Sequence, residues 1–128
     1  MASKTAVSTD KAPAPLPFFS QGIKCNGMVY CSGSIGMDPV SGKMVEGSIE
    51  ARTEQALLNL SAVLEAAGSS LDNAVKVNIF ITDMKDFAAM NSVYAKFFTK
   101  DPKPVRTCVA VHQLPLGTDV EIEVTAFE

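Results

Sequence analysis

A predicted strand near the end of the chain carries an arginine that could bind a small carboxylate. In segment 104–111 valines alternate with other residues, and Arg106 shares one side of the strand with Cys108 and Ala110. An arginine is seldom fully buried without a partner, because removing a guanidinium from water is costly. A guanidinium fixed on a strand is also a good receptor for a carboxylate. Arg106 therefore serves either an internal ion pair or a bound ligand.

Two glutamates on the last predicted strand supply the other charged candidates. Glu121 and Glu123 alternate with apolar residues, so both lie on one side of strand 119–127. If this strand pairs with strand 105–112, the glutamates and Arg106 can share a face and form a cross-strand ion pair. Alternatively, Arg106 holds a substrate carboxylate while Glu121 orients or deprotonates a water. The spacing does not decide between these interpretations.

Cys108 is a conceivable nucleophile, because the nearby positive charge of Arg106 would favour its thiolate. The chain has one histidine, His112, and no clear third residue to orient it, so a catalytic dyad of Cys108 and His112 is not favoured. The cysteines lack a CxxC spacing, and a zinc site would need Cys25, Cys31, Cys108 and His112 to converge. No phosphate loop or dinucleotide fingerprint is present, so we expect chemistry without a metal or cofactor.

Length and charge limit the classes of protein to consider. The 128 residues predict a single domain over 1–128. A net charge of −3 and the absence of a lysine or arginine run argue against nucleic acid or an anionic membrane as the main partner. No stretch approaches the ~20 apolar residues of a membrane span. The N-terminus lacks a signal peptide or a strong mitochondrial presequence, so the cytoplasm is expected and the mitochondrion stays open.

The hydrophobic pattern predicts an α+β domain with a mixed sheet and two helices. Asn26-Gly27 is a strong turn signal between strands 21–25 and 28–35. Ser48 is a credible N-cap for a helix that Gly68 closes. Further expected elements are an edge strand near 5–9, a strand at 74–81 with Val75, Val77, Ile79 and Ile81 on one face, a helix capped by Asp83, and strands 105–112 and 119–127.

Two helices can cover only one face of such a sheet. We expect the opposite face to carry Arg106, Cys108, Glu121 and Glu123, a mixture too apolar for open solvent and too charged for a core. Self-association through this face, with polar groups lining a shared cleft, is the expected resolution.

Several short motifs follow one another along the chain. Their order and spacing resemble those of the RidA/YjgF family of enamine/imine deaminases over essentially the whole length of the chain. The motifs are Phe19-Ser20-Gln21-Gly22 after Ala12-Pro13-Ala14, Ser32-Gly33-Ser34-Ile35, Glu65-Ala66-Ala67-Gly68, Val75-Lys76-Val77, Asp86-Phe87-Ala88-Ala89-Met90-Asn91, and finally Pro104-Val105-Arg106-Thr107-Cys108-Val109 with Leu114-Pro115 and Glu121-Ile122-Glu123.

The resemblance implies a chorismate-mutase-like α+β subunit that assembles as a homotrimer with clefts between subunits. It also implies hydrolysis of reactive 2-imino or 2-enamino acids, such as 2-aminoacrylate, 2-iminobutanoate and 2-iminopropanoate. The products are 2-oxo acids and ammonia, and no cofactor takes part.

The same resemblance assigns roles to individual residues. The arginine matching Arg106 binds the substrate carboxylate, and the glutamate matching Glu121 positions the attacking water. Backbone groups matching Gly33 and Cys108 contact the substrate, and the residue matching Asn91 lies near the cleft.

Two positions depart from the family pattern. Phe19 stands where a tyrosine is usual, and a phenylalanine can pack but cannot donate a hydrogen bond. Ser34 stands where a glutamine is common. These departures leave open a non-enzymatic protein that binds 2-oxo acids or regulates a partner through the same cleft. RNA cleavage or translation inhibition is a third interpretation, against which the acidic charge counts.

Overall fold

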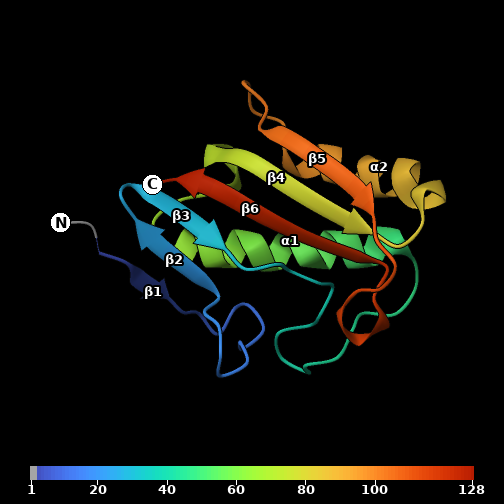
Figure 1. Ribbon diagram of the computed structural model, residues 1–128, viewed down its shortest axis with the longest axis horizontal. Helices are drawn as coiled ribbons and strands as arrows, with labels where there is room; N and C mark the ends of the chain where they lie inside the picture. Colours follow the sequence, from blue (N-terminus) through green and yellow to red (C-terminus); the bar gives the residue numbers. More distant parts are fainter. Residues whose placement is uncertain (1–2) are drawn as a thin grey trace.

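The computed structural model describes residues 3–128, which form one mixed six-stranded sheet with two helices on one side (Figure 1). The strand order is β1-β2-β3-β6-β4-β5, and β4 and β5 are the parallel pair. This arrangement confirms the expected α+β class. The elements are β1 (Thr5–Val7), β2 (Gly22–Cys25), β3 (Met28–Cys31), α1 (Ile49–Ala66), β4 (Ala74–Ile81), α2 (Phe87–Phe97), β5 (Val105–Ala110) and β6 (Val120–Phe127), with short 3₁₀ turns at Leu71–Asn73, Met84–Asp86 and Pro115–Gly117.

The β2–β3 hairpin forms at the predicted turn. Asn26 and Gly27 have φ angles of 53° and 75°, the pair of positive values that a two-residue type I′ turn requires. The second arm is shorter than predicted, because β3 ends at Cys31 and the chain rejoins the sheet only through a bridge between Ser34 and Ile122. Gly33 lies in this interruption, next to β6.

Helix α1 covers the centre of the sheet. It begins at the predicted N-cap, where the Ser48 side chain accepts a hydrogen bond from the Ala51 amide, and Gly68 follows its end with a φ of 83°. Leu57, Leu60 and Leu64 of this helix are buried in the core. Each such side chain contributes about 1.5–3 kcal/mol through burial. No helix among residues 3–128 has the length and apolar character needed to cross a bilayer.

The register between β4 and β6 separates the two faces of the sheet. Ile79 lies opposite Ile122, and both are fully buried toward the helices. Phe80 lies opposite Glu121 on the uncovered face. The expectation that Val75 shares a face with Val77, Ile79 and Ile81 was wrong, because a register shift between residues 74 and 76 turns the Val75 side chain outward and leaves it 40% exposed.

Strand β5 faces the opposite way from the sequence-based prediction. Arg106 pairs with Val77 and Cys108 pairs with Ile79, so both side chains lie on the helix-covered face. The expectation that Arg106 and Cys108 share the uncovered face with Glu121 was therefore wrong. The apolar alternation misled because β5 is an edge strand whose valines point outward: Val105 is 65% exposed.

The uncovered face combines apolar and acidic side chains. Strand alternation places Tyr30, Val109 and Phe127 on it, and they are 48%, 41% and 47% exposed. Glu121 and Glu123 lie on the same face. The predicted mixed character of this face is thus present, although the arginine is not part of it.

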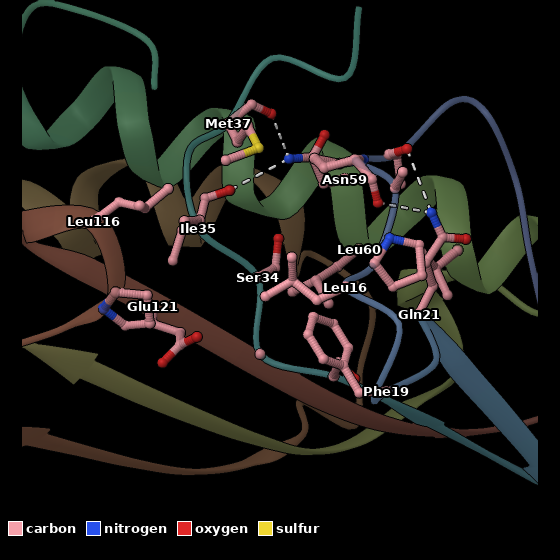
Figure 2. Close-up of a pocket in the computed structure, with 18 of the residues that line it drawn as sticks. Leu16, Phe19, Gln21, Ser34, Ile35, Met37, Asn59, Leu60, Leu116 and Glu121 are labelled. Carbon is pink, nitrogen blue, oxygen red and sulfur yellow. Dashed lines mark hydrogen bonds between the residues drawn. The ribbon is translucent and has the colours of Figure 1, made fainter. Parts of the chain in front are cut away.

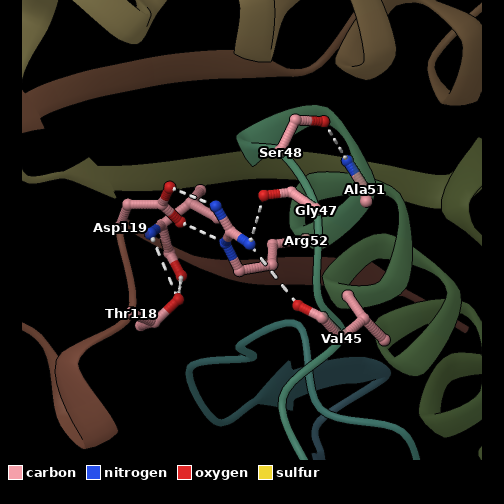
Figure 3. Close-up of polar contacts among 8 residues, drawn as sticks. Val45, Gly47, Ser48, Ala51, Arg52, Thr118 and Asp119 are labelled. Carbon is pink, nitrogen blue, oxygen red and sulfur yellow. Dashed lines mark hydrogen bonds and ion pairs between the residues drawn. The ribbon is translucent and has the colours of Figure 1, made fainter.

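An ion pair connects the first turns of α1 to the start of β6 (Figure 3). Arg52 donates from Nε and Nη2 to the two carboxylate oxygens of Asp119, over 2.7 and 2.8 Å. Its Nη1 donates to the carbonyls of Val45 and Gly47, which fixes the loop before the helix. Gly36 packs against the same turn, where an added Cβ would lie 2.7 Å from the Arg52 Cα. The hydrogen bonds from Arg52 lower the pKa of Asp119.

We expect Arg52→Gln to lower the free energy of unfolding by about 1.5–3 kcal/mol at neutral pH, since it removes charge-assisted hydrogen bonds to Asp119. The Asp119 pKa is depressed in the folded state, so this contribution is complete above about pH 4 and disappears as pH falls through the folded-state value. Urea denaturation of both proteins at several pH values measures the difference.

Lys103→Gln is the matched control. It removes an ion pair with Asp101 whose side chains are 52% and 84% exposed, so the expected change is below about 1 kcal/mol. An Arg52→Gln deficit no larger than that of the control, or one unchanged at low pH, contradicts the assignment.

Candidate active site

A cavity of about 740 Å³ opens beside the start of β6 (Figure 2). Its walls come from five parts of the chain: the proline-rich segment 12–21, segment 32–37, the middle of α1, the loop at 115–116 and Glu121 of β6. Three of the predicted site residues, Phe19, Gly33 and Glu121, line it together. Segments far apart in sequence therefore meet around the Glu121 carboxylate.

The Glu121 carboxylate lies against the main chain of Gly33. A Cβ built at residue 33 would be 2.6 Å from Oε2 of Glu121, so the position has no room for a side chain while the carboxylate stays there. Burial raises the pKa of Glu121, and the charge of Glu123 raises it further. Glu123 itself accepts a hydrogen bond from Asn78 over 2.9 Å. A carboxylate with a raised pKa is a better general base near neutral pH.

Phe19 belongs to a segment that is held in place by Gln21. The buried Gln21 side chain donates from Nε2 to the carbonyls of Thr9, Ala12 and Pro13 and accepts from the Thr9 amide. Phe19 remains 45% exposed at the mouth of the cavity. This role of Gln21 was not predicted, although a glutamine beside a proline-rich segment is a natural donor for the free carbonyls of that segment.

Arg106 is fixed on the other face of the sheet by one side of α2. Its Nη1 donates to Oδ1 of Asn91 over 2.7 Å. Its Cζ lies 4.8 Å from the ring centroid of Tyr94 and 5.5 Å from that of Phe87. Residues 87, 91 and 94 have helical spacing, so they present one face to the guanidinium. The family resemblance placed Asn91 near the cleft, whereas the contacts of the two aromatic rings with Arg106 were not predicted.

The internal ion-pair interpretation of Arg106 was wrong. The salt bridges found among residues 3–128 involve neither Arg106 nor Glu121.

Cys108 is not a favoured nucleophile, because burial raises its pKa more than the charge of Arg106 lowers it. Among residues 3–128 no three His, Cys, Asp or Glu side chains gather closely enough to hold a metal ion.

The predicted site residues therefore form two groups. Phe19, Gly33 and Glu121 line the cavity, whereas Asn91, Arg106 and Cys108 lie on the helix side at the β5 edge. Strand β4 separates β5 from β6, which puts their backbones about 10 Å apart. Because the side chains also point to opposite faces, one chain cannot direct Arg106 and Glu121 at the same small molecule.

The fold defines a class of small α+β proteins in which a mixed six-stranded sheet carries two helices on one face. The chain belongs to the RidA/YjgF family, whose family model, described as Endoribonuclease L-PSP, matches residues 9–128.

Two curated relatives illustrate the range of names in this family. "Protein MMF1, mitochondrial" of Saccharomyces cerevisiae is 50% identical over 124 residues, covering 97% of this chain and 84% of the relative. "Reactive Intermediate Deaminase A, chloroplastic" of Arabidopsis thaliana is 44% identical over 123 residues, covering 96% of this chain and 65% of the relative.

Two solved structures share the fold. The crystal structure of yeast Mmf1 has a TM-score of 0.95 and 49% identity, with 98% of this chain and 99% of that chain covered. The E. coli TdcF structure with bound serine has a TM-score of 0.90 and 34% identity, with 97% and 98% covered. Both comparisons agree with the sheet and helices described above.

We expect Glu123→Gln to lower the pKa of Glu121, since it removes the neighbouring like charge, yet to leave that pKa above the ordinary glutamate value because burial persists. Carboxyl-carbon NMR titration of the two proteins measures both pKa values. Glu65→Gln, at an exposed position on α1, is the control and should leave the Glu121 titration unchanged. An unchanged Glu121 midpoint in Glu123→Gln contradicts the proposed coupling.

Proposed function

We propose that this protein hydrolyses reactive 2-imino and 2-enamino acids, including 2-aminoacrylate, 2-iminobutanoate and 2-iminopropanoate, to 2-oxo acids and ammonia. The observation that carries the proposal is that the Arg106 guanidinium is held in place but has no carboxylate partner. Its guanidinium is oriented by Asn91 and two aromatic rings, and no carboxylate among residues 3–128 pairs with it. A fork of N–H donors prepared in this way suits a substrate carboxylate.

The comparisons support the same class of substrate. One relative is named as a reactive intermediate deaminase. A structural neighbour, E. coli TdcF, was solved with bound serine, in which the carbon next to the carboxylate bears a nitrogen. In a 2-imino acid the carbon next to the carboxylate also bears a nitrogen.

In the proposed reaction Arg106 binds the carboxylate and the main chain of Gly33 and Cys108 contacts the substrate. The oxygen of a water bonds to the imine carbon as its proton passes to Glu121, and the C=N electron pair moves to nitrogen. The proton then passes from Glu121 to nitrogen, which gives a carbinolamine. Glu121 next transfers the hydroxyl proton to the same nitrogen, so that the C–N bond breaks, ammonia leaves and the carbonyl forms. An enamine enters the same route after its β-carbon takes up a proton and its nitrogen releases one. Phe19 packs against the site without donating a hydrogen bond.

We propose that the site is completed between copies in a homotrimer. Arg106 and Glu121 lie on opposite faces of one sheet, so a common substrate needs Arg106 from one copy and Glu121 from another. The exposed apolar side chains of the uncovered face, among them Tyr30 and Phe127, support an interface there. The number of three subunits is taken from the family resemblance.

We propose that the protein is located in the cytoplasm. The alternative is the mitochondrion, because the name of the yeast relative includes the word mitochondrial. Imaging of the tagged protein in cells distinguishes the two locations.

Two other activities have less support. The family description includes the word endoribonuclease, but among residues 3–128 no lysine, arginine or histidine lines the cavity, and the net charge of the chain is −3. A binding or regulatory protein that holds 2-oxo acids is consistent with the missing hydroxyl at Phe19. Ligand-induced stabilisation without imine turnover would identify that function.

We expect Arg106→Ala to lower kcat/KM for imine hydrolysis by about a hundredfold or more, because the charged hydrogen bonds to the carboxylate are lost. Ammonia release from an imine produced by a threonine dehydratase measures this rate. Lys96→Ala removes an exposed cation from α2 and serves as control, with unchanged activity. Wild-type rates in Arg106→Ala would eliminate the carboxylate-binding role.

A second experiment tests the shared site. Arg106→Ala and Glu121→Gln copies are each expected to be inactive as pure assemblies. In a refolded equal mixture, about a quarter of the sites should combine the intact Arg106 of one copy with the intact Glu121 of another, which restores about a quarter of the activity. Sedimentation velocity checks that the assembly is trimeric in every sample. A mixture without recovered activity contradicts the intersubunit arrangement.

A further inference from the structure

The cavity continues well beyond the groups assigned to the reaction. From Glu121 and Gly33 it passes Ser34 and reaches Leu60 of α1 (Figure 2). Its volume of about 740 Å³ falls in the range of about 300–1,000 Å³ that is typical of pockets for drug-sized molecules. A three- or four-carbon imino acid would leave most of this space empty.

The polar side chains of the cavity wall are already engaged, with one exception. Gln21, Ser32, Ser34 and Asn59 each donate their side-chain hydrogen bonds to main-chain carbonyls of the surrounding loops or of α1. These bonds hold the walls of the cavity and leave none of these four side chains with a donor directed at a ligand. Glu121 is the exception among the lining side chains of the described chain. A polar ligand group placed beyond Glu121 would therefore give up contacts with water without gaining a side-chain donor, which is costly.

The remaining walls are apolar. Leu60 forms a buried wall, while Leu16, Phe19 and Leu116 are 55%, 45% and 75% exposed to solvent. An apolar group that enters from the Glu121 end would cover this surface, and removing apolar surface from water favours binding. The cavity thus has one charged end and one long apolar arm, which suits a molecule with one polar end and an apolar tail.

We propose that this arm is a side-chain pocket that makes the protein prefer 2-imino acids with large apolar side chains over small or polar ones. The inference rests on the proposed function, because the imine is placed at Glu121 with the side chain directed toward Leu60. Such imines arise from oxidation of the corresponding apolar amino acids, whereas dehydration of hydroxyl-bearing amino acids supplies the small ones. The small imines react at the same site with fewer apolar contacts.

The test compares imines made by an amino-acid oxidase from alanine, 2-aminobutyrate, leucine and asparagine. The side chains of leucine and asparagine have similar shape and opposite polarity. We expect kcat/KM to rise at least about tenfold from the alanine imine to the leucine imine, the scale that added methylenes give in an apolar pocket. The asparagine imine should fall at least about tenfold below the leucine imine. A flat series, or equal rates for leucine and asparagine imines, overturns the proposal.

Two variants examine the pocket itself. Leu16→Asn places a polar group on the apolar arm, and Ala14→Trp fills it from an exposed position. Each should lower the ratio of kcat/KM for the leucine imine to that for the alanine imine by at least about fivefold. Val40→Asn is the matched control, because Val40 is 94% exposed and does not line the cavity, and it should keep the wild-type ratio. An unchanged ratio in folded Leu16→Asn contradicts the assignment.

A binding readout separates this proposal from the proposed function. If no imine is hydrolysed faster than in buffer, the proposed catalysis fails, and the pocket is tested with the stable 2-oxo acids derived from alanine and leucine. We then expect the oxo acid with the leucine side chain to raise the Tm at concentrations at least about tenfold lower than pyruvate requires. Equal concentrations for the two, or no shift with either, overturn the pocket proposal.

Discussion

The alternation of side chains along β6 and its neighbour β4 is the constraint on which the candidate site depends. Burial of Ile122 beneath α1 forces Glu121 onto the opposite face, because successive residues of a strand point in opposite directions. The parallel pairing of β4 and β5 places Arg106 beside Val77, on the helix side. A shift of the register by one residue would exchange the faces of either group. The hydrophobic core therefore determines where each charged group lies.

Separation of the two charges has an electrostatic consequence within one chain. A guanidinium and a carboxylate on the same face of adjacent strands would attract and neutralise each other. The sheet prevents this, so Arg106 is left with aromatic faces and an asparagine oxygen, and Glu121 is left with a partly desolvated carboxylate. Neither group has an ion-pair partner among residues 3–128. The architecture thus keeps apart two charged groups that pairing on one face would turn into a structural ion pair.

The sequence predicted the features that depend on local chemistry. Asn26-Gly27 gave the hairpin and Ser48 gave the start of α1, because turn and cap preferences need only neighbouring residues. The orientation of β5 was mispredicted, because alternation defines two faces of an edge strand but not which one is covered. Val75 was misplaced because a bulge leaves no signal in the hydrophobic pattern. The cavity could not be predicted from local patterns in the sequence, because its walls come from segments that meet only in the folded chain.

Two glycines described above differ in how a mutation would be seen in a genetic screen. A side chain at Gly33 meets the end of the flexible Glu121 side chain, which can swing aside without disturbing the backbone. A side chain at Gly36 meets the main chain of α1 at Arg52, which cannot move alone. Substitutions at Gly36 therefore lower cellular abundance and activity together. Substitutions at Gly33 displace the Glu121 carboxylate but leave the fold intact, so an assay of protein level would record that allele as normal even where the proposed activity is lost.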